Sequence, residues 1–242
     1  MKKPQMILFD YGQTLLYEPD IDFLRGEEAV FAHVVRNPHG VTPQEACAFG
    51  LELFERYNRC RRDGFELHEW QTLKGKYEAL GIELDISLPE AEEILWTAAS
   101  PGACMPCVHE LLSCLQQRGI RSGVISNIGW SGAALTRRLN RLLPENHFEF
   151  VIASSEYGLR KPDRFLFDLA LQKAGLSPDD VWYCGDNLHA DVCGAHGAGI
   201  FPVLYECAVP DGRTASNAGV PADFPYLHIH GWPELMAMLE TL

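Results

Sequence analysis

From residue 101 onward, short apolar runs of β type alternate with stretches of helical periodicity. An earlier apolar run, Met6 to Phe9, predicts a first strand, and the later strands are predicted at residues 120–126, 148–154, 181–185, 200–205 and 226–230. The predicted helices lie near residues 106–118, 130–142, 163–174, 190–198 and 232–241. Because strands that alternate with helices are joined by right-handed crossovers, we predict a mostly parallel sheet covered on both faces.

Residues 17 to 100 carry helical periodicity and almost no strand signal. Thr42-Pro43-Gln44-Glu45 is a capping box with proline at the first helical position. Apolar residues then follow at spacings of three and four and form one stripe: Ala46, Phe49, Leu53, Tyr57 and Cys60. Helices are expected near residues 20–36, 42–62, 66–80 and 88–99. The pattern therefore predicts a small helical bundle inserted directly after the first strand.

Together these patterns predict an α/β fold with a three-layer, Rossmann-like parallel sheet core and an inserted α-helical cap domain. We assign residues 1–16 and 101–242 to the core and residues 17–100 to the cap. The length of 242 residues fits one large domain or one domain that carries a smaller insert.

The charge of the chain excludes some classes of partner. Lys and Arg number 20 against 33 Asp and Glu, which gives a net charge of −13. A nucleic acid or an anionic membrane would require a basic face, so neither is expected, whereas a small phosphorylated metabolite needs only a few local cations. No apolar run approaches the roughly 20 residues that span a bilayer, and the apolar run near the start is too short for a signal peptide. We expect a cytoplasmic protein, and no pattern sets its oligomeric state.

The eight cysteines do not form a disulfide framework. Cys104 and Cys107 have the spacing of half a zinc site, with His109 and Cys114 nearby, but a second spaced pair is missing. The favoured interpretation is a set of free thiols in a reducing compartment.

Polar residues stand just past four predicted strands, where an open parallel sheet binds its ligands. They are Asp10, Ser126 with Asn127, Lys161, and Asp186 with Asp191. Asp10 and Asp186 could jointly hold a hard cation such as Mg²⁺ through oxygen atoms, while Lys161 and Ser126 hold an anion. A metal, a carboxylate nucleophile and a phosphate cradle together indicate phosphoryl transfer through an aspartyl-phosphate.

Each of these residues also has a structural interpretation. Asp10 could cap a helix, Ser126-Asn127 and Gly185-Asp186 could be ordinary turns, and Lys161 could be a solvated lysine before a helix. Taken singly, the structural interpretation is favoured for each. Their occurrence at four successive strand ends favours a common site.

Four stretches carry a resemblance to a known family: ILFDYGQTLL, GVISNIG, SEYGLRKPDRFLFDLALQKAGL and YCGDNLHADVCGAHGAGI. They resemble haloacid-dehalogenase-superfamily hydrolases with a helical cap inserted after the first strand. The resemblance implies that Asp10 is the nucleophile, that Ser126 and the amide of Asn127 bind the transferring group, and that Lys161 holds that group near Asp10.

The resemblance also implies the metal ligands. Asp186 would ligate Mg²⁺ together with Asp10 and the backbone carbonyl of Gly12, and Asp191 would support the site from the same loop. Phosphatases of this family carry a second aspartate where this chain has Gly12. Glycine offers no general acid or base, a role worth roughly 10²–10⁴-fold in rate.

Gly12 keeps three hypotheses open. The first is a Mg²⁺-dependent phosphatase that acts on a small phosphorylated metabolite and is weakened at Gly12. The second is a catalytically impaired phosphate-binding or regulatory module. The third is a metal-free haloacid dehalogenase, against which Asp186 counts as an unneeded metal ligand.

Other polar residues are weaker candidates. His189 could replace the missing acid, although a surface histidine is the favoured interpretation. His228 and His230 are expected to flank a buried isoleucine. Four basic residues of the predicted cap could meet a substrate, but a solvated helical face is the default for them: Arg61, Arg62, Lys74 and Lys76.

Overall fold

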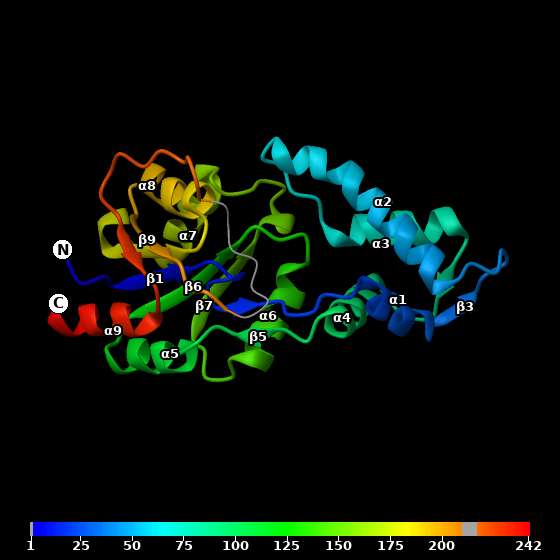
Figure 1. Ribbon diagram of the computed structural model, residues 1–242, viewed down its shortest axis with the longest axis horizontal. Helices are drawn as coiled ribbons and strands as arrows, with labels where there is room; N and C mark the ends of the chain where they lie inside the picture. Colours follow the sequence, from blue (N-terminus) through cyan, green and yellow to red (C-terminus); the bar gives the residue numbers. More distant parts are fainter. Residues whose placement is uncertain (1, 210–216) are drawn as a thin grey trace.

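A six-stranded parallel sheet forms the centre of the computed structural model, which describes residues 2–209 and 217–242 (Figure 1). Its strand order is β10-β9-β8-β1-β6-β7. The strands are β1 (Met6–Phe9), β6 (Arg121–Ser126), β7 (Phe148–Ala153), β8 (Val181–Gly185), β9 (Phe201–Tyr205) and β10 (Leu227–Ile229). Every neighbouring pair runs parallel, which confirms the predicted α/β fold class.

Helices cover both faces of the sheet and complete three layers. The helices α5 (Val108–Gln117), α6 (Gly132–Leu142) and α9 (Trp232–Thr241) lie on one face, and α7 (Arg164–Ala174) and α8 (Gly194–Gly197) lie on the other (Figure 1). The side chains of β1 point alternately to the two faces of the sheet. Ile7 and Phe9 pack with α5, α6 and α9, while Met6 and Leu8 pack with α7 and α8.

The predicted helix near residues 190–198 is present, but its first part is not α-helical. Leu188–Cys193 forms a π-helical turn, and only Gly194–Gly197 is α-helical. The turn is wound around Asp191, whose carboxylate accepts a hydrogen bond of 3.0 Å from the backbone N–H of Asn187. This distortion brings a carboxylate to the carboxyl end of β8, and such turns are frequent at functional sites.

Four helices from residues 17–100 gather beyond the carboxyl ends of the strands, on the right of Figure 1: α1 (Phe23–Phe31), α2 (Pro43–Arg62), α3 (Glu69–Leu80) and α4 (Leu88–Ala99). The predicted capping box is confirmed, since Glu45 N–H donates to the Thr42 hydroxyl and Thr42 N–H donates to the Glu45 carboxylate. Part of these helices has an apolar cluster of its own, formed by α1, α3 and α4 around Val30, Leu73 and Leu95. The proposed boundaries at residues 17 and 100 stay a prediction.

Two expectations for this region need correction. The predicted helix at residues 20–36 is too long, because α1 ends at Phe31 and β3 (Val34–Arg36) pairs antiparallel with β4 (Glu83–Leu84). The β-branched Val34 and Val35 favour a strand over a helix at that point. The stripe on α2 is also less buried than expected, since Ala46 is buried but Cys60 is exposed.

A second short antiparallel pair consists of β2 (Leu16–Tyr17) and β5 (Ala103–Cys104). It joins the two chain segments that connect the sheet with the helices α1 to α4. In the described residues, no helix is long and apolar enough to cross a membrane.

Candidate active site

Three carboxylates meet at the carboxyl end of the sheet. Asp10, Asp186 and Asp191 each present an oxygen atom, and these atoms all lie within 4.8 Å of one another. The ammonium of Lys161 lies 2.9 Å from Asp10 and 2.6 Å from Asp191. The structure therefore brings together four of the residues that the sequence placed just past three different strands.

The sheet positions these carboxylates directly. Asp10 follows β1, and its backbone N–H donates to the carbonyl of Cys184 at 2.9 Å, which continues the pairing between β1 and β8. Asp186 follows β8. Gly185 precedes it and must be glycine, because a Cβ there would lie 2.3 Å from Cγ of Asp191. The close approach of Asp191 to the main chain thus depends on the absence of a side chain.

Lys161 is buried and has four hydrogen-bond acceptors. Its ammonium donates to Asp10, to Asp191, to the carbonyl of Ile125 at 3.0 Å and to the hydroxyl of Tyr183 at 2.6 Å. Four partners exceed the three protons of an ammonium, so the group is held in place from all sides. Burial alone would lower the pKa of Lys161, but the charges of Asp10 and Asp191 outweigh burial and raise it.

Asn127 holds the main chain on either side of this lysine. Its side-chain amide donates to the carbonyl of Lys161 at 2.8 Å and accepts from the N–H of Lys161 at 2.7 Å. The sequence pointed to the backbone amide of Asn127, and the structure shows a further task for its side chain. Ser126, the last residue of β6, is buried beside it. Gly12 lies two residues past Asp10, with no atom within 4 Å of where its Cβ would stand.

Burial makes the carboxylates difficult to ionise together. The pKa of Asp10 is raised to about 6, and burial is the largest cause. The charge of Lys161 lowers this pKa, and the charge of Asp191 raises it further. Burial followed by the charges of Asp10 and Asp191 raises the pKa of Asp186 to about 8. Three acids thus face one ammonium. This set of oxygen donors with excess negative charge fits a hard divalent cation such as Mg²⁺.

Tyr183 is a member of this site that the sequence reasoning missed. Its hydroxyl donates to the carbonyl of Ile125 at 3.0 Å and lies 3.2 Å from Asp191. A signal was present, because a tyrosine inside a buried strand must find a partner for its hydroxyl group.

A loop between α2 and α3 also reaches the site. Glu66 is buried and pairs with Arg160, while its N–H donates to the carbonyl of Gly158 at 2.9 Å. The N–H of Arg160 in turn donates to the carbonyl of Gly64 at 3.0 Å. Residues 64–66 are therefore fastened to the segment that immediately precedes Lys161. No pattern in the sequence indicated this contact.

A cavity of about 360 Å³ lies between α1, α2, α3 and the loop after β6. Asn127, whose side chain is bonded to the main chain of Lys161, contributes to its wall. Lys76 also lines it, and the expectation of a solvated lysine at this position is wrong. The ammonium of Lys76 is buried and pairs with Glu27.

Two other candidates lie apart from the carboxylates. His189 is exposed, in agreement with the interpretation of a surface histidine. Cys104 and Cys107 belong to neither of the two groups of metal-ligating side chains found among residues 2–209 and 217–242. The second of those groups joins Glu206 to His228 and His230, which flank the buried Ile229 as expected.

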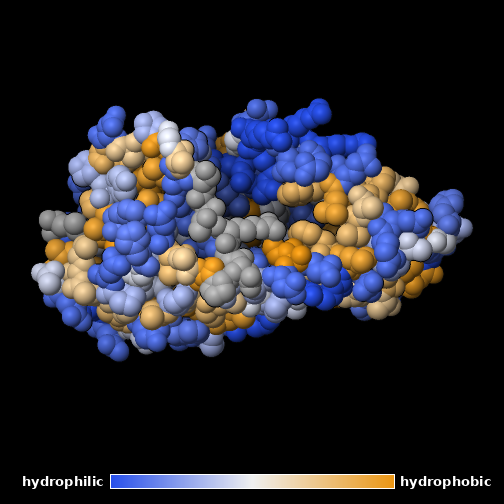
Figure 2. All heavy atoms as spheres, viewed as in Figure 1, coloured by the Kyte–Doolittle hydropathy of each residue, from blue (hydrophilic) through white to orange (hydrophobic). Residues whose placement is uncertain are grey.

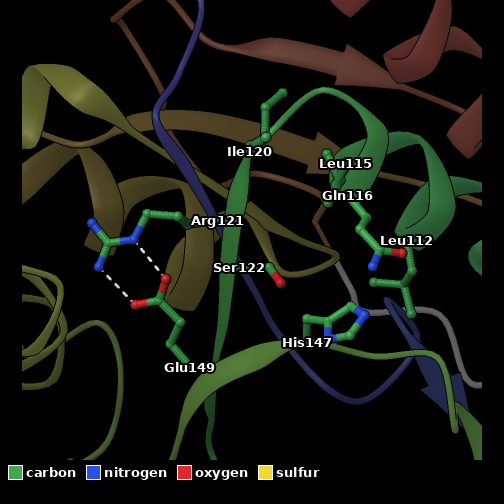
Figure 3. A pocket seen from close by; sticks show the side chains of 9 residues that line it. Leu112, Leu115, Gln116, Ile120, Arg121, Ser122, His147 and Glu149 are labelled. Atoms are coloured by element: carbon green, nitrogen blue, oxygen red, sulfur yellow. Dashed lines mark hydrogen bonds and ion pairs between the residues drawn. The ribbon is translucent and has the colours of Figure 1, made fainter.

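A cavity of about 260 Å³ lies at the opposite end of the sheet, where β6 begins (Figure 3). Two of its charged groups are paired with each other, since Arg121 donates two hydrogen bonds of 2.6 Å to Glu149. Because the carboxylates stand at the other end of the strands, this cavity takes no part in their chemistry.

Comparisons with known proteins point to one family of hydrolases. The profile of the haloacid dehalogenase-like hydrolase family matches residues 99–204, a segment that contains Ser126, Asn127, Lys161, Asp186 and Asp191. The chain is 27% identical over 163 residues to the ribulose-1,5-bisphosphate 5-phosphatase of Halopiger xanaduensis, an alignment that covers 67% of this chain and 62% of that protein. It is 30% identical over 167 residues to haloacid dehalogenase-like hydrolase domain-containing protein 3 of Xenopus laevis, with 65% of each chain covered.

The aligned part thus spans somewhat less than two thirds of these two relatives. Among solved structures, the 2-haloacid dehalogenase of Pseudomonas syringae pv. Tomato superposes with a TM-score of 0.63 at 21% identity and covers 98% of both chains. That likeness extends the shared fold over the helices α1 to α4. The family profile, the relatives and the fold all indicate a hydrolase of the haloacid dehalogenase superfamily.

Proposed function

We propose that this protein is a Mg²⁺-dependent phosphatase that removes phosphate from a small phosphorylated metabolite through an aspartyl-phosphate at Asp10. The observation that carries the proposal is the cluster of Asp10, Asp186 and Asp191 around the ammonium of Lys161. Ribulose-1,5-bisphosphate 5-phosphatase is among the relatives, and this name supports the same class of reaction. The proposed division is a core of residues 1–16 and 101–242 and a cap of residues 17–100.

In the proposed first step, a carboxylate oxygen of Asp10 attacks phosphorus and the bond from phosphorus to the leaving oxygen breaks. Lys161, Ser126 and the backbone N–H of Asn127 hold the phosphate oxygens during this displacement. In the second step, water attacks the phosphorus of the aspartyl-phosphate and releases phosphate and the Asp10 carboxylate. Because its pKa is raised only to about 6, Asp10 is mostly ionised at neutral pH, as a nucleophile must be.

Asp10, Asp186 and the carbonyl oxygen of Gly12 are the proposed ligands of Mg²⁺, with Asp191 beside them. When bound, the cation supplies positive charge that offsets the charge of the phosphate and of the acids around it. The position of Lys161, fixed by four acceptors, keeps its own charge near Asp10 throughout.

Gly12 weakens this machinery, because no side chain at that position can protonate the leaving group or activate water. The same residue favours a second candidate function, a regulatory module that binds a phosphate group without turning it over. The eight free cysteines support a cytoplasmic location. Neither a nucleic acid nor a membrane is proposed as a partner.

The test of the proposal is an assay of phosphate release from a panel of phosphorylated metabolites, with Mg²⁺ and with a chelator. We expect release from at least one member of the panel in Mg²⁺ and none in the chelator. Full activity in the chelator would contradict the proposal and favour a metal-free mechanism. Binding of phosphate analogues without any release would favour the regulatory module.

The metal site makes a separate prediction about stability. The folded pKa of Asp186, about 8, lies above the ordinary value of 3.8 for an aspartate, so the folded metal-free protein retains a proton that the unfolded chain releases. The stability of the metal-free protein should therefore fall as the pH rises from about 4 to about 8. Replacement of Asp186 by Asn should raise the metal-free melting temperature at pH 8 by about 4 °C or more and remove the stabilisation by Mg²⁺.

Differential scanning calorimetry with and without Mg²⁺ measures both effects. The matched control is Asp179→Asn, which changes an exposed aspartate in the turn before β8. This control should melt as the wild type does and keep the Mg²⁺ shift. An undiminished Mg²⁺ shift in Asp186→Asn would mean that the cation binds elsewhere.

A further inference from the structure

The cavity beside the carboxylates has an apolar wall that is open to solvent. Its apolar lining includes Ile21, Phe23, Leu51, Phe54 and Leu95. Among the described residues, eight large apolar side chains are markedly exposed, and three of them, Phe23, Leu51 and Phe54, lie here. Figure 2 shows apolar residues gathered around the hollow below α2. Exposed apolar side chains that collect at one cavity indicate a binding surface.

The opposite wall is polar and contains one acid without a partner. Lys76 pairs with Glu27, which also accepts a hydrogen bond of 2.9 Å from the hydroxyl of Tyr77, so these groups satisfy one another. Glu69 differs, because no N–H or O–H group of the described residues donates a hydrogen bond to its carboxylate. Burial raises the pKa of Glu69 to about 7, with Lys76 opposing it. A half-buried carboxyl group in this position lacks the donor that would stabilise its charge.

The cavity connects with the proposed site of phosphate transfer through one residue. Asn127 lines the cavity and is also bonded through its side chain to both backbone groups of Lys161. Trp130, a few residues further on, forms a fixed part of the wall because its ring stacks on that of Trp96 at 4.9 Å. A molecule whose phosphate lies against Lys161 would therefore extend its other end into this cavity.

We infer that the cavity binds the leaving group of the phosphomonoester, and that this group combines an apolar body with an ammonium or hydroxyl group that donates a hydrogen bond to Glu69. This inference rests on the proposed phosphatase function. The apolar body packs on Leu51 and Phe54, and the donor reaches the polar wall. A volume of about 360 Å³ stands at the low end of ligand cavities, which suits a metabolite rather than a macromolecule.

Three benzyl phosphates that differ only at the para position test the inference: 4-ethylbenzyl, 4-(hydroxymethyl)benzyl and 4-(aminomethyl)benzyl phosphate. The oxygen that leaves phosphorus is the same in all three, so differences in kcat/KM report on the distant group. We expect the aminomethyl compound to exceed the ethyl compound by about tenfold or more, with the hydroxymethyl compound between them.

Two variants and two controls assign the effect to the cavity. Glu69→Gln should reduce the aminomethyl-to-ethyl ratio to less than about threefold, and Phe54→Ala should raise KM for all three compounds by about fivefold or more. Glu78→Gln, an exposed acid on the same helix as Glu69, should keep the wild-type ratio. Phe165→Ala, an exposed phenylalanine on α7, should keep the wild-type KM values.

Acetyl phosphate, which is too small to reach the polar wall, separates the two possible failures. Hydrolysis of acetyl phosphate with equal kcat/KM for the three benzyl compounds would overturn the inference and leave the proposed function standing. If no phosphate compound is hydrolysed, the proposed function fails. In that case the inference is tested by calorimetric binding of the three matching benzylphosphonates in Mg²⁺. Affinities that fall in the order aminomethyl, hydroxymethyl, ethyl support the inference, and equal affinities or no binding overturn it.

Discussion

Replacement of Asp10 by Asn is expected to abolish phosphate release, by at least about 10³-fold in kcat, while the fold remains intact. A carboxamide cannot form the proposed acyl phosphate, because it lacks the anionic oxygen that attacks phosphorus. The fold should survive, since an amide oxygen can still accept the hydrogen bond that Lys161 donates to Asp10 at 2.9 Å. The loss of one of three crowded carboxylates also removes repulsion from Asp186.

Single-turnover and steady-state assays of phosphate release would measure this loss. Beryllium fluoride, which mimics a phosphorylated carboxylate, should raise the melting temperature of the wild type in Mg²⁺ and have no such effect on Asp10→Asn. Asp179→Asn serves as the control and should retain wild-type kcat. Turnover of Asp10→Asn near the wild-type level would show that another residue is the nucleophile.

Replacement of Gly12 by Asp is expected to raise turnover of alkyl phosphates by about tenfold or more. The new carboxyl group could protonate an alkoxide leaving group and then activate water, which glycine cannot do. The backbone admits the change, because Gly12 does not have the left-handed conformation that favours glycine and no atom lies within 4 Å of the added Cβ. Aryl and acyl phosphates should gain less, since their leaving groups need little protonation.

The matched control for this variant is Gly12→Asn, which adds a side chain of the same size without an acid. Parallel kcat measurements on a glycerol phosphate and on 4-nitrophenyl phosphate should show a gain for Asp alone and mainly on the alkyl substrate. A stable Gly12→Asp protein that is no faster than Gly12→Asn would mean that proton transfer does not limit the rate. If neither protein turns over any phosphate ester, yet both bind phosphate analogues with Mg²⁺, the regulatory function takes precedence.

The sheet could be predicted from the sequence because its strands are short apolar runs that alternate with amphipathic helices. An open parallel sheet binds its ligands at the carboxyl ends of its strands. Asp10, Lys161 and Asp186 could therefore be predicted from the sequence as members of one site. The limits of α1 could not be found in the same way. Its apolar pattern continues to residue 36. The β-branched Val34 and Val35 weaken the helix there, but the strand forms through the pairing of Val34 with Leu84, which is distant in sequence.

Contacts that depend on the packing of distant segments were out of reach for the same reason. Lys76 looks like an exposed residue of α3 until Glu27 of α1 is placed against it. The hydroxyl of Tyr183 finds Lys161 and Asp191 only after β8 lies beside β1. Leu51 and Phe54 of α2 likewise line a cavity rather than a core, a difference that local periodicity does not express.

The central place of β1 in the sheet affects the order in which the chain can fold during its synthesis. The strand is bonded to β6 on one edge and to β8 on the other. Its residues Met6–Phe9 are made before both partner strands, and they can pair only after residues 121–126 or residues 181–185 have left the ribosome. At roughly 5–20 residues per second, this apolar strand remains without partners for several seconds or longer, while α1 to α4 can already pack on one another. The nascent chain thus passes through a stage in which the apolar strand β1 is exposed while α1 to α4 are already folded. A chaperone that shields apolar segments would act on the chain at that stage.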